Sequence, residues 1–242
     1  MIAIEIKNLS KKFGEVKALN GVNLQIKQGE LFALLGLNGA GKTTLIKILS
    51  CLTKPSAGNA TILGFDVTQK VDNVKQIIGI SPQETSVAPL LSVRENLEFM
   101  CEIYGLKKED ANLRAEDLIK DFSLSEVADR NAGKLSGGYQ RRLSIAMALV
   151  GKPKILFLDE PTLGLDVIAR RELWNNIRSL KANTTMILTT HYLEEAEQLS
   201  DRIGIMSKGK MKIVGTPNEI IASLGKKNFE EAFISVASGG AL

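Results

Sequence analysis

Apolar residues follow two spacings along the chain, and these spacings predict its first strands and helix. Residues 2–7 and 22–26 alternate apolar with polar positions, as half-buried strands do. Residues 31–35 form a continuous apolar run, which is expected of a strand covered on both faces. A glycine-rich turn follows, and apolar residues then recur at helical spacing over residues 45–52, before Pro55 ends the helix. The predicted order is therefore buried strand, glycine loop, helix.

The middle of the chain, from about residue 92 to residue 150, has a helical pattern. Ser92 and Glu95 have the spacing of a capping box, which marks the start of a helix. Further helices are expected near residues 108–122 and 137–150. This stretch is therefore predicted to be a helical insertion.

The chain then returns to strands. Residues 155–158 and 185–190 read as buried strands, with a helix capped by Asp166 between them and another helix after His191. Residues 203–214 have the pattern of a β-hairpin. Strands that alternate with helices predict an α/β fold with a largely parallel sheet.

The length of 242 residues suits one domain with a subdomain better than two independent units. We assign residues 1–222 to this domain, with a core at 1–88 and 151–222 and a helical subdomain at about 89–150. The remaining residues, 223–242, form a short tail. Its last segment, residues 225–242, ends in small residues and is expected to fray.

Composition narrows the class of protein. A hydrophobic content of 44% with 24% charged residues excludes a disordered or fibrous chain. The longest stretch without a charged residue, 182–193, is far shorter than the about 20 apolar residues of a membrane-spanning helix. The N-terminus alternates like a strand and does not resemble a signal peptide. Cys51 and Cys101 suit a reducing cytoplasm and cannot build a thiolate zinc site. We therefore expect a cytoplasmic protein.

The charge pattern gives little evidence for an anionic partner. The net charge is +4, and basic residues occur in pairs at most, so the chain has no block of the kind that marks a nucleic-acid-binding arm. A solvated surface is favoured, and no nucleic-acid partner is expected. The single histidine, His191, excludes His-rich metal sites.

The glycine-rich turn carries the most specific chemical signal. Residues 36–43, GLNGAGKT, satisfy the G-x-x-x-x-G-K-[ST] pattern. The glycines let backbone N–H groups turn toward phosphate oxygens, at the start of a helix whose dipole favours anions. Lys42 adds a cation for the β- and γ-phosphates, and Thr43 offers a hydroxyl to Mg²⁺. The residues expected to bind the nucleotide here are Gly36, Asn38, Gly39, Ala40, Gly41, Lys42, Thr43 and Thr44.

Two further motifs support a nucleotide site. Asp159 follows the predicted strand 155–158 and is the expected partner of Mg²⁺, while Glu160 is placed to polarise an attacking water. Residues 135–140, LSGGYQ, predict a helix start with a cap at Ser136 and two bare glycines, a shape suited to an anion. The last motif is weak alone and becomes diagnostic beside the other two.

In this order the motifs resemble those of the nucleotide-binding subunit of an ABC transporter, over about residues 2–220. GLNGAGKT resembles the Walker A loop, ILFLDE the Walker B strand and LSGGYQ the signature. The resemblance implies a P-loop NTPase fold of the ABC type. Its mostly parallel core sheet would carry an N-terminal antiparallel β subdomain and an inserted α-helical subdomain.

The resemblance also implies roles for residues that are ambiguous alone. Gln83 resembles the Q-loop glutamine, which contacts Mg²⁺ and the transmembrane partner, and Asp166 lies in the D-loop. His191 resembles the switch histidine that reaches the γ-phosphate, and Phe13 takes the place of the aromatic that stacks on adenine. Taken singly, Phe13 and His191 would more often be core residues and Gln83 a surface residue. The implied catalytic residues are Lys42, Gln83, Glu160 and His191, and the implied metal ligands are Thr43, Gln83 and Asp159.

Three positions depart from the family's pattern. Phe13 stands where Tyr is commoner, Tyr139 stands at the fifth signature position where Gln is usual, and Leu163 precedes Gly164 where a small polar residue is frequent. None of these departures removes a phosphate ligand or a catalytic group.

In the family, the Walker A loop of one chain faces the signature of another, so Ser136, Gly137, Gly138 and Asp166 are expected to act on nucleotide across that interface. The resemblance implies ATP and Mg²⁺ as cofactors, and a homodimer or a paired ATPase subunit in the ATP-bound state. It also implies a separate transmembrane permease, which would hold the chain at the inner face of the membrane. The expected activity is ATP hydrolysis coupled to transport.

The direction of transport is less determined. Residues 228–233 and 91–106 resemble ATPase subunits of bacterial exporters of drugs, ions, lipids or polysaccharides, which favours export. An importer subunit and a soluble scaffold, such as an iron–sulfur assembly ATPase, stay open as alternatives. A DNA-repair ABC ATPase would need a long coiled-coil insertion, and a translation-type protein would usually carry two phosphate loops.

Overall fold

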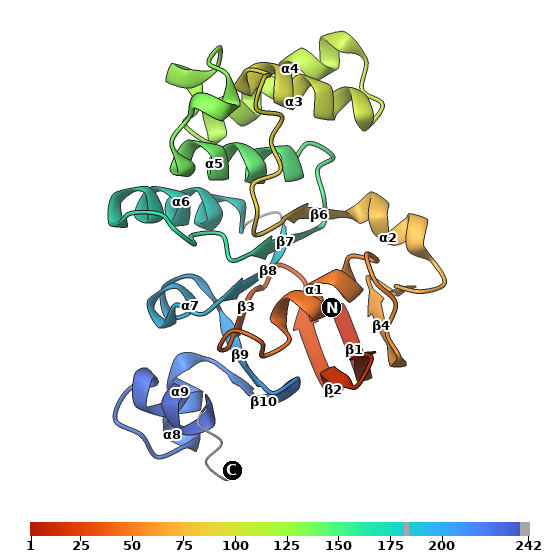
Figure 1. The fold of residues 1–242 in the computed structure, drawn as a ribbon, viewed down its shortest axis with the longest axis vertical. Coiled ribbons are helices and arrows are strands. Elements are labelled where there is room, and N and C mark those ends of the chain that lie inside the picture. The colour runs from red at the N-terminus through yellow and green to blue at the C-terminus, as the bar shows by residue number, and fades with distance from the viewer. Residues whose placement is uncertain (182–183, 238–242) are drawn as a thin grey trace.

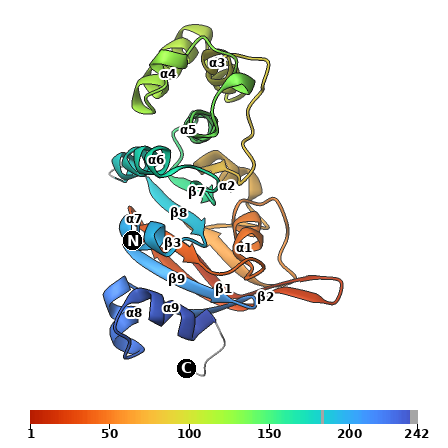
Figure 2. The ribbon, with the colours of Figure 1, turned by 60° about the vertical axis from the view of Figure 1, so that its left-hand side comes forward.

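The computed structural model describes residues 1–181 and 184–237, which form two β-sheets with helices around them (Figures 1 and 2). The smaller sheet has the strand order β2-β1-β4-β5 and is antiparallel throughout. The larger sheet has the order β10-β9-β3-β8-β7-β6, and only its β10–β9 pair is antiparallel. A mostly parallel core sheet beside an antiparallel β subdomain is thus confirmed. The strands are β1 Ile2–Phe13, β2 Val16–Lys27, β3 Leu31–Leu35, β4 Ala57–Ile62, β5 Phe65–Asp66, β6 Ile78–Ser81, β7 Ile155–Asp159, β8 Thr185–Thr190, β9 Arg202–Ser207 and β10 Lys210–Gly215.

Helices surround the larger sheet and form the insertion. The helix that follows the glycine loop, α1 Lys42–Leu49, contacts strands of both sheets. The insertion contains α3 Val93–Ile103, α4 Lys108–Asp121 and α5 Gly137–Ala148, which lie beyond the β6 end of the sheet in Figure 1. The remaining helices are α2 Val71–Ile77, α6 Val167–Leu180, α7 Leu193–Leu199, α8 Pro217–Ser223 and α9 Phe229–Ala237, with short 3₁₀ turns at Ser125–Val127 and Ala132–Lys134.

Strand β3 separates the two hydrophobic cores. Leu31, Ala33 and Leu35 point into a core shared with the insertion and with α6, α7 and α9. Phe32 and Leu34 point the other way, into a core shared with α1 and the smaller sheet. Side chains alternate between the faces of a strand, so a continuous apolar run buries both faces, as the sequence predicted.

Two predicted helix starts have the expected caps. Ser92 Oγ accepts a hydrogen bond from the Glu95 amide at 3.2 Å, and the Glu95 carboxylate accepts one from the Ser92 amide at 2.7 Å. Asp166 Oδ1 accepts from the amides of Ile168 and Ala169, both at 2.9 Å. These contacts satisfy amides in the first turn that have no partner within their helix.

The chain between the first hairpin and the insertion was read incompletely from the sequence. Strand β1 extends to Phe13 and strand β2 begins at Val16. This extra length was not predicted, because register shifts interrupt the apolar–polar alternation there. The helix α1 stops at Leu49, before a left-handed Cys51 with φ 60°, and so is shorter than predicted. The elements β4, β5, α2 and β6 were not predicted, since each is too short to show a clear period.

The C-terminal segment is more ordered than the sequence indicated. Phe229, Ala232, Phe233 and Val236 are buried in the core, at the i, i+3, i+4 and i+7 spacing of one face of α9. The expected fraying is therefore wrong for residues 229–237. Residues 238–242, where the rest of that expectation falls, lie outside the described residues.

Within the described part of the chain, no helix has the length and apolarity needed to cross a membrane.

Replacement of Phe229 by alanine tests whether α9 is part of the core. The ring is 2% exposed, so Phe229→Ala should lower the free energy of unfolding by about 3 kcal/mol, measured by urea denaturation. Glu230→Ala, on the exposed side of the same helix, should change it by less than about 0.5 kcal/mol. Equal effects of the two substitutions would contradict the docked helix.

Candidate functional site

The parallel strands of the larger sheet bring the predicted site residues to one edge. The glycine loop follows Leu35 at the end of β3, and Glu160 follows Asp159 at the end of β7. His191 follows Thr190 at the end of β8. The carboxyl edge of a parallel sheet is where ligands bind in open α/β folds.

The loop between β3 and α1 needs glycine at two positions. A Cβ on Gly36 would lie 2.5 Å from the carbonyl oxygen of Met206 in β9, and a Cβ on Gly41 would lie 2.6 Å from that of Ala18 in β2. Gly41 also has a φ of +105°, which L side chains rarely adopt. Strands of both sheets thus fix the path of the loop backbone.

A cavity of about 670 Å³ opens beside this loop. Most of the predicted nucleotide-binding and catalytic residues line it: Asn38, Gly39, Ala40, Gly41, Lys42, Thr43, Thr44, Gln83, Glu160 and His191. Two further lysines line the cavity, Lys17 from β2 and Lys208 from the β9–β10 turn. Neither was predicted, because both come from segments distant in sequence from the motifs. A cavity with a glycine loop and three lysines fits a polyphosphate.

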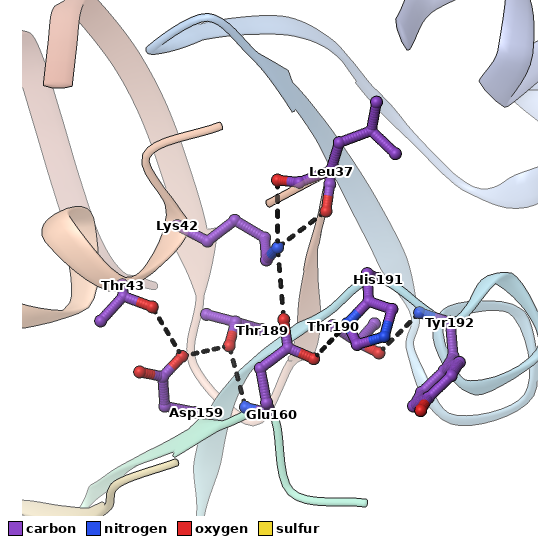
Figure 3. A network of polar contacts seen from close by, with 10 residues as sticks. Leu37, Lys42, Thr43, Asp159, Glu160, Thr189, Thr190, His191 and Tyr192 are labelled. Atoms are coloured by element: carbon purple, nitrogen blue, oxygen red, sulfur yellow. Dashed lines mark hydrogen bonds and ion pairs between the residues drawn. The ribbon is translucent and has the colours of Figure 1, made fainter. Parts of the chain in front are cut away.

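A polar network includes several of the residues that line the cavity (Figure 3). Lys42 Nζ donates to the Gly36 carbonyl oxygen at 2.7 Å and lies 3.2 Å from Glu160 Oε1. The other carboxylate oxygen, Glu160 Oε2, is 2.8 Å from His191 Nδ1. The Lys42 and Glu160 side chains are almost fully buried. One carboxylate therefore joins the loop lysine to the only histidine of the chain.

A phosphate bound by Lys42 would compete with Glu160 for the amine. The Lys42 amine contacts the Gly36 carbonyl oxygen and the Glu160 carboxylate. Buried charges need such partners, since an unpaired one costs several kcal/mol. An incoming phosphate can replace Glu160 as the counter-ion of Lys42, which would release the carboxylate for chemistry.

Two of the three predicted metal ligands, Thr43 and Asp159, are in contact, while Gln83 lines the cavity and forms no hydrogen bond with either of these two described residues. Thr43 Oγ1 donates to Asp159 Oδ1 at 3.3 Å, and the Thr189 hydroxyl donates to the same oxygen at 2.5 Å. Hydroxyl and carboxylate oxygens are ligands that Mg²⁺ prefers, and Mg²⁺ takes few from the protein when a nucleotide supplies the others. The donor set therefore fits Mg²⁺. Thr189, which orients Asp159, was not identified from the sequence.

The backbone of Glu160 has a conformation that few residues adopt. Its φ is +49°, and its amide donates to the carbonyl and the hydroxyl oxygens of Thr189, at 3.1 and 3.0 Å. A left-handed non-glycine residue costs about 1–3 kcal/mol and is enriched at functional sites. These two bonds to Thr189 fix the backbone of Glu160 at the end of the strand.

Comparison with known proteins identifies the family. The family model for ABC transporters matches residues 19–163, more than half of the chain. The chain belongs to the ABC transporter family. A daunorubicin resistance ATP-binding protein of Streptomyces coeruleorubidus is 41% identical over 229 residues, which cover 94% of this chain and 71% of that protein. Nod factor export ATP-binding protein I of Burkholderia lata is 40% identical over 221 residues, which cover 91% and 73%.

A solved structure has the same fold. It is a dimeric ATP-binding cassette in a post-hydrolysis state, bound to ADP and Pi. It is 30% identical and superposes with a TM-score of 0.79 over 88% of this chain and 98% of that one. The chain is thus an ABC ATPase that binds and hydrolyses ATP, as its motifs predicted.

The signature of this ABC ATPase lies apart from its own cavity. Ser136, Gly137, Gly138 and Asp166 are not among the described residues that line it. The predicted serine cap is wrong as a hydrogen bond, because Ser136 occupies the N-cap position of α5 and its side chain accepts nothing from the helix. The start of α5 packs closely on α6, since a Cβ on Gly138 would lie 3.1 Å from Ala169 Cβ.

Arg141 connects the signature helix to the Q-loop of the ABC ATPase. The guanidinium donates to the Pro82 carbonyl oxygen at 2.6 Å and also to that of Gln83. Burial lowers the pKa of Arg141, opposed by the negative charges of Asp159 and Glu195. Arg141 was not identified from the sequence, although it directly follows the signature.

Phe13 lies outside the residues that line the cavity. Its ring is 52% exposed, and Lys11 Nζ sits 4.9 Å from the ring centroid. Its cross-strand partner Val16 does line the cavity. The adenine role of Phe13 stays a prediction.

Removal of the charge on Glu160 should strengthen ATP binding. Glu160→Gln eliminates both the ion pair that holds Lys42 and a negative charge beside the phosphates. The dissociation constant for ATP should fall about tenfold, or about 1.4 kcal/mol, in calorimetric titration. Lys42→Ala should lose measurable binding, and Glu197→Gln, on the exposed side of α7, should leave it unchanged. Weaker binding by Glu160→Gln would show that the ion pair does not oppose the nucleotide.

Proposed function

We propose that this ABC ATPase powers export through a separate membrane permease at the inner face of the membrane, with MgATP bound between its own cavity and the signature of a second ATPase subunit. The Lys42–Glu160–His191 network beside Thr43 and Asp159 is the observation that carries the hydrolytic part. The relatives named for daunorubicin resistance and Nod factor export favour export over import. They give no support to an iron–sulfur scaffold.

Binding of ATP rearranges the polar network. Lys42 leaves Glu160 and the Gly36 carbonyl for the β- and γ-phosphates, which are cradled by the loop N–H groups at the start of α1. Thr43 and Asp159, together with Gln83, would hold Mg²⁺, which when bound supplies positive charge that neutralises the phosphates. Lys17 and Lys208, at the mouth of the cavity, add charge of the same sign.

Glu160 is the general base in this scheme. Its carboxylate, released from Lys42, accepts a proton from the water that attacks the γ-phosphorus, while the bond to ADP breaks. His191 keeps Glu160 in place through the contact between Nδ1 and Oε2, and its other nitrogen is available to the γ-phosphate. A positioned base contributes about 10²–10⁴-fold to rate.

A second subunit would complete the site. One chain holds one phosphate loop and one signature, and its signature does not reach its own cavity. Val167 and Ile168, directly after the D-loop Asp166, are 56% and 73% exposed and form an apolar surface that a second subunit could cover. Ser136, Gly137 and Gly138 of that subunit, at the start of α5, would then meet the γ-phosphate.

An apolar groove next to the Q-loop suits the permease. It has a volume of about 410 Å³ and is lined by residues of α2, β6, α3 and α5 and by residues that directly follow α1 and α3, among them Leu52, Met100 and Tyr104. Pro82 lines this groove, and the next residue, Gln83, lines the nucleotide cavity. The Arg141 guanidinium donates hydrogen bonds to the carbonyl oxygens of both residues. We assign the groove to an apolar segment of the permease, because a segment seated there would contact the loop that reaches the nucleotide.

Loss of the base or of its histidine should stop turnover without loss of ATP binding. Glu160→Gln and His191→Ala should each lower the steady-state rate of phosphate release by at least about 10²-fold. Glu160→Gln should also accumulate an ATP-bound dimer, visible by size-exclusion chromatography. No other imidazole can replace His191. Turnover at the wild-type rate in either variant would contradict the role given to that residue.

A charge in the groove should uncouple the ATPase from the membrane. Leu52→Glu changes a 64% exposed side chain, so the fold and basal ATPase activity should be kept. We expect at least a tenfold smaller share of the variant in washed membranes from cells that produce the whole transporter. Leu113→Glu, at a 68% exposed leucine on α4, is the matched control. Equal recovery of the two variants would place the permease elsewhere.

A further inference from the structure

Thr189 carries a buried hydroxyl near the end of β8. The residue is 0% exposed. Side chains alternate along a strand, so Thr189 shares a face of the sheet with Ile187, which packs in the core that includes α1. Valine has nearly the same shape as threonine and no polar group to bury, so it would be the cheaper residue at such a position. The hydroxyl therefore calls for a function.

This hydroxyl both accepts and donates a hydrogen bond (Figure 3). Thr189 Oγ1 accepts from the Glu160 amide at 3.0 Å and donates to Asp159 Oδ1 at 2.5 Å. A hydroxyl has a single proton, and an ionised carboxylate can only accept. The two bonds therefore run in one direction, from the amide through the hydroxyl to the carboxylate.

The path of these bonds closes into a ring, because Asp159 and Glu160 are consecutive residues. From the Asp159 carboxylate it runs through Thr189 Oγ1 to the Glu160 nitrogen, and the backbone returns it to Asp159. The in-register pairing of Asp159 in β7 with Thr189 in β8 brings these groups together. The ring restricts the side chain of Asp159 and the backbone of Glu160 at the same time, since neither can turn without breaking one of the bonds.

Glu160 depends on such support, because its backbone is left-handed, with a φ of +49°. This conformation is unfavourable for a residue with a side chain, and it persists where the surrounding contacts determine it. The Glu160 amide donates to the hydroxyl and to the carbonyl oxygen of Thr189, so one residue supplies both acceptors.

Asp159 is held more closely by Thr189 than by Thr43. The bond from Thr43 Oγ1 to Asp159 Oδ1 is 3.3 Å long, against 2.5 Å for the bond from Thr189 Oγ1. Thr43 lines the nucleotide cavity, whereas Thr189 is not among the described residues that do so. Thr189 is therefore placed to orient Asp159 without binding the nucleotide itself.

We propose that Thr189 is a positioning residue for ATP hydrolysis, whose hydroxyl sets the metal-binding carboxylate of Asp159 and the backbone of the general base Glu160 in one arrangement. The bond to Asp159 keeps this carboxylate beside Thr43, the other ligand proposed for Mg²⁺. Loss of a group that orients a metal ligand typically lowers metal affinity or activity about 10–100-fold. The inference rests on the proposed function, since it takes Asp159 as a ligand of Mg²⁺ and Glu160 as the base.

A second threonine of β8 supplies a matched control for the hydroxyl. Thr185, at the opposite end of the strand, is 4% exposed, and its hydroxyl accepts from the Gly29 amide at 3.0 Å. Thr189→Val and Thr185→Val each remove one buried hydroxyl and keep the shape of the side chain. Each should therefore lower the thermal midpoint by a similar amount, about 2–4 °C. A purely structural role for Thr189 predicts no further difference between the two variants.

The dependence of ATP binding on Mg²⁺ separates the two roles. In calorimetric titration, Thr189→Val should bind ATP about tenfold more weakly than the wild type in Mg²⁺, but within about twofold of it in EDTA, because Lys42 and the phosphate loop are unchanged. Its kcat in Mg²⁺ should fall about tenfold. Thr189→Ser keeps the hydroxyl and should stay within about twofold of the wild type in all three measurements, as should Thr185→Val.

Thr189→Ala decides the matter if the valine variant does not fold. Alanine leaves space in the core and differs from serine only by the hydroxyl, so the alanine and serine variants should differ about tenfold in kcat and in affinity for ATP in Mg²⁺. Equal losses in Mg²⁺ and in EDTA, or equal losses with and without the hydroxyl, would overturn the role of Thr189 alone. Wild-type ATP affinity and turnover that do not depend on Mg²⁺ would overturn the proposed metal site, and this inference with it.

Discussion

The level ends of three neighbouring parallel strands determine where the glycine loop, the carboxylate pair and the histidine of the nucleotide site lie. Leu35 of β3 pairs with Thr190 of β8, and Thr189 of β8 pairs with Asp159 of β7. The glycine loop, the carboxylate pair and the histidine therefore leave the sheet at the same height. A slip of one residue in any of these pairings would turn the side chains at the strand end to the opposite face. Burial of both faces of β3 and β7 prevents such a slip, since each face has its own core.

The buried contact between Lys42 and Glu160 links occupancy of the site to its chemistry. The two buried charges compensate each other, and a Glu160 carboxylate held by Lys42 is less available to activate water. A phosphate that takes Lys42 also releases Glu160, so the active arrangement depends on the substrate. The left-handed backbone at Glu160, whose amide donates to two oxygens of Thr189, keeps the carboxylate within reach of both Lys42 and His191.

Much of this arrangement follows from the sequence, because the motifs are local and their strands are strongly patterned. The strand Leu31–Leu35 and the strand Thr185–Thr190 have the predicted bounds, and residues of the predicted phosphate loop between β3 and α1 line the cavity. What sequence reasoning missed depends on contacts between distant segments. Lys208 lines the cavity only because the β9–β10 turn packs on the loop, where the Gly209 amide donates to the Ala40 carbonyl oxygen.

Other elements were missed because they are short or irregular. β-Bulges hid the true length of β1 and β2, and the seven-residue α2 buries only Val74. The fraying of the tail was predicted from its small terminal residues. The apolar residues at helical spacing that begin at Phe229 are a stronger signal, and they form the buried face of α9. The burial of Glu195, whose Oε1 accepts a hydrogen bond from the Trp174 indole, could not be predicted from the sequence. Glutamate is almost always exposed, and the neighbouring polar residues gave no contrary signal.

The side chains that lie between α6 and the start of α7 also allow the protein to be followed without added labels. Trp174 is the only tryptophan of the chain and His191 the only histidine, and Arg170 with Tyr192 lies between them. Indole emission and the imidazole proton resonances of the unmodified protein therefore each arise from a single residue, and both residues flank the same short helix. A change in the Trp174 emission or in the His191 resonances therefore reports on this one corner of the fold. No other residue of the chain contributes to either signal.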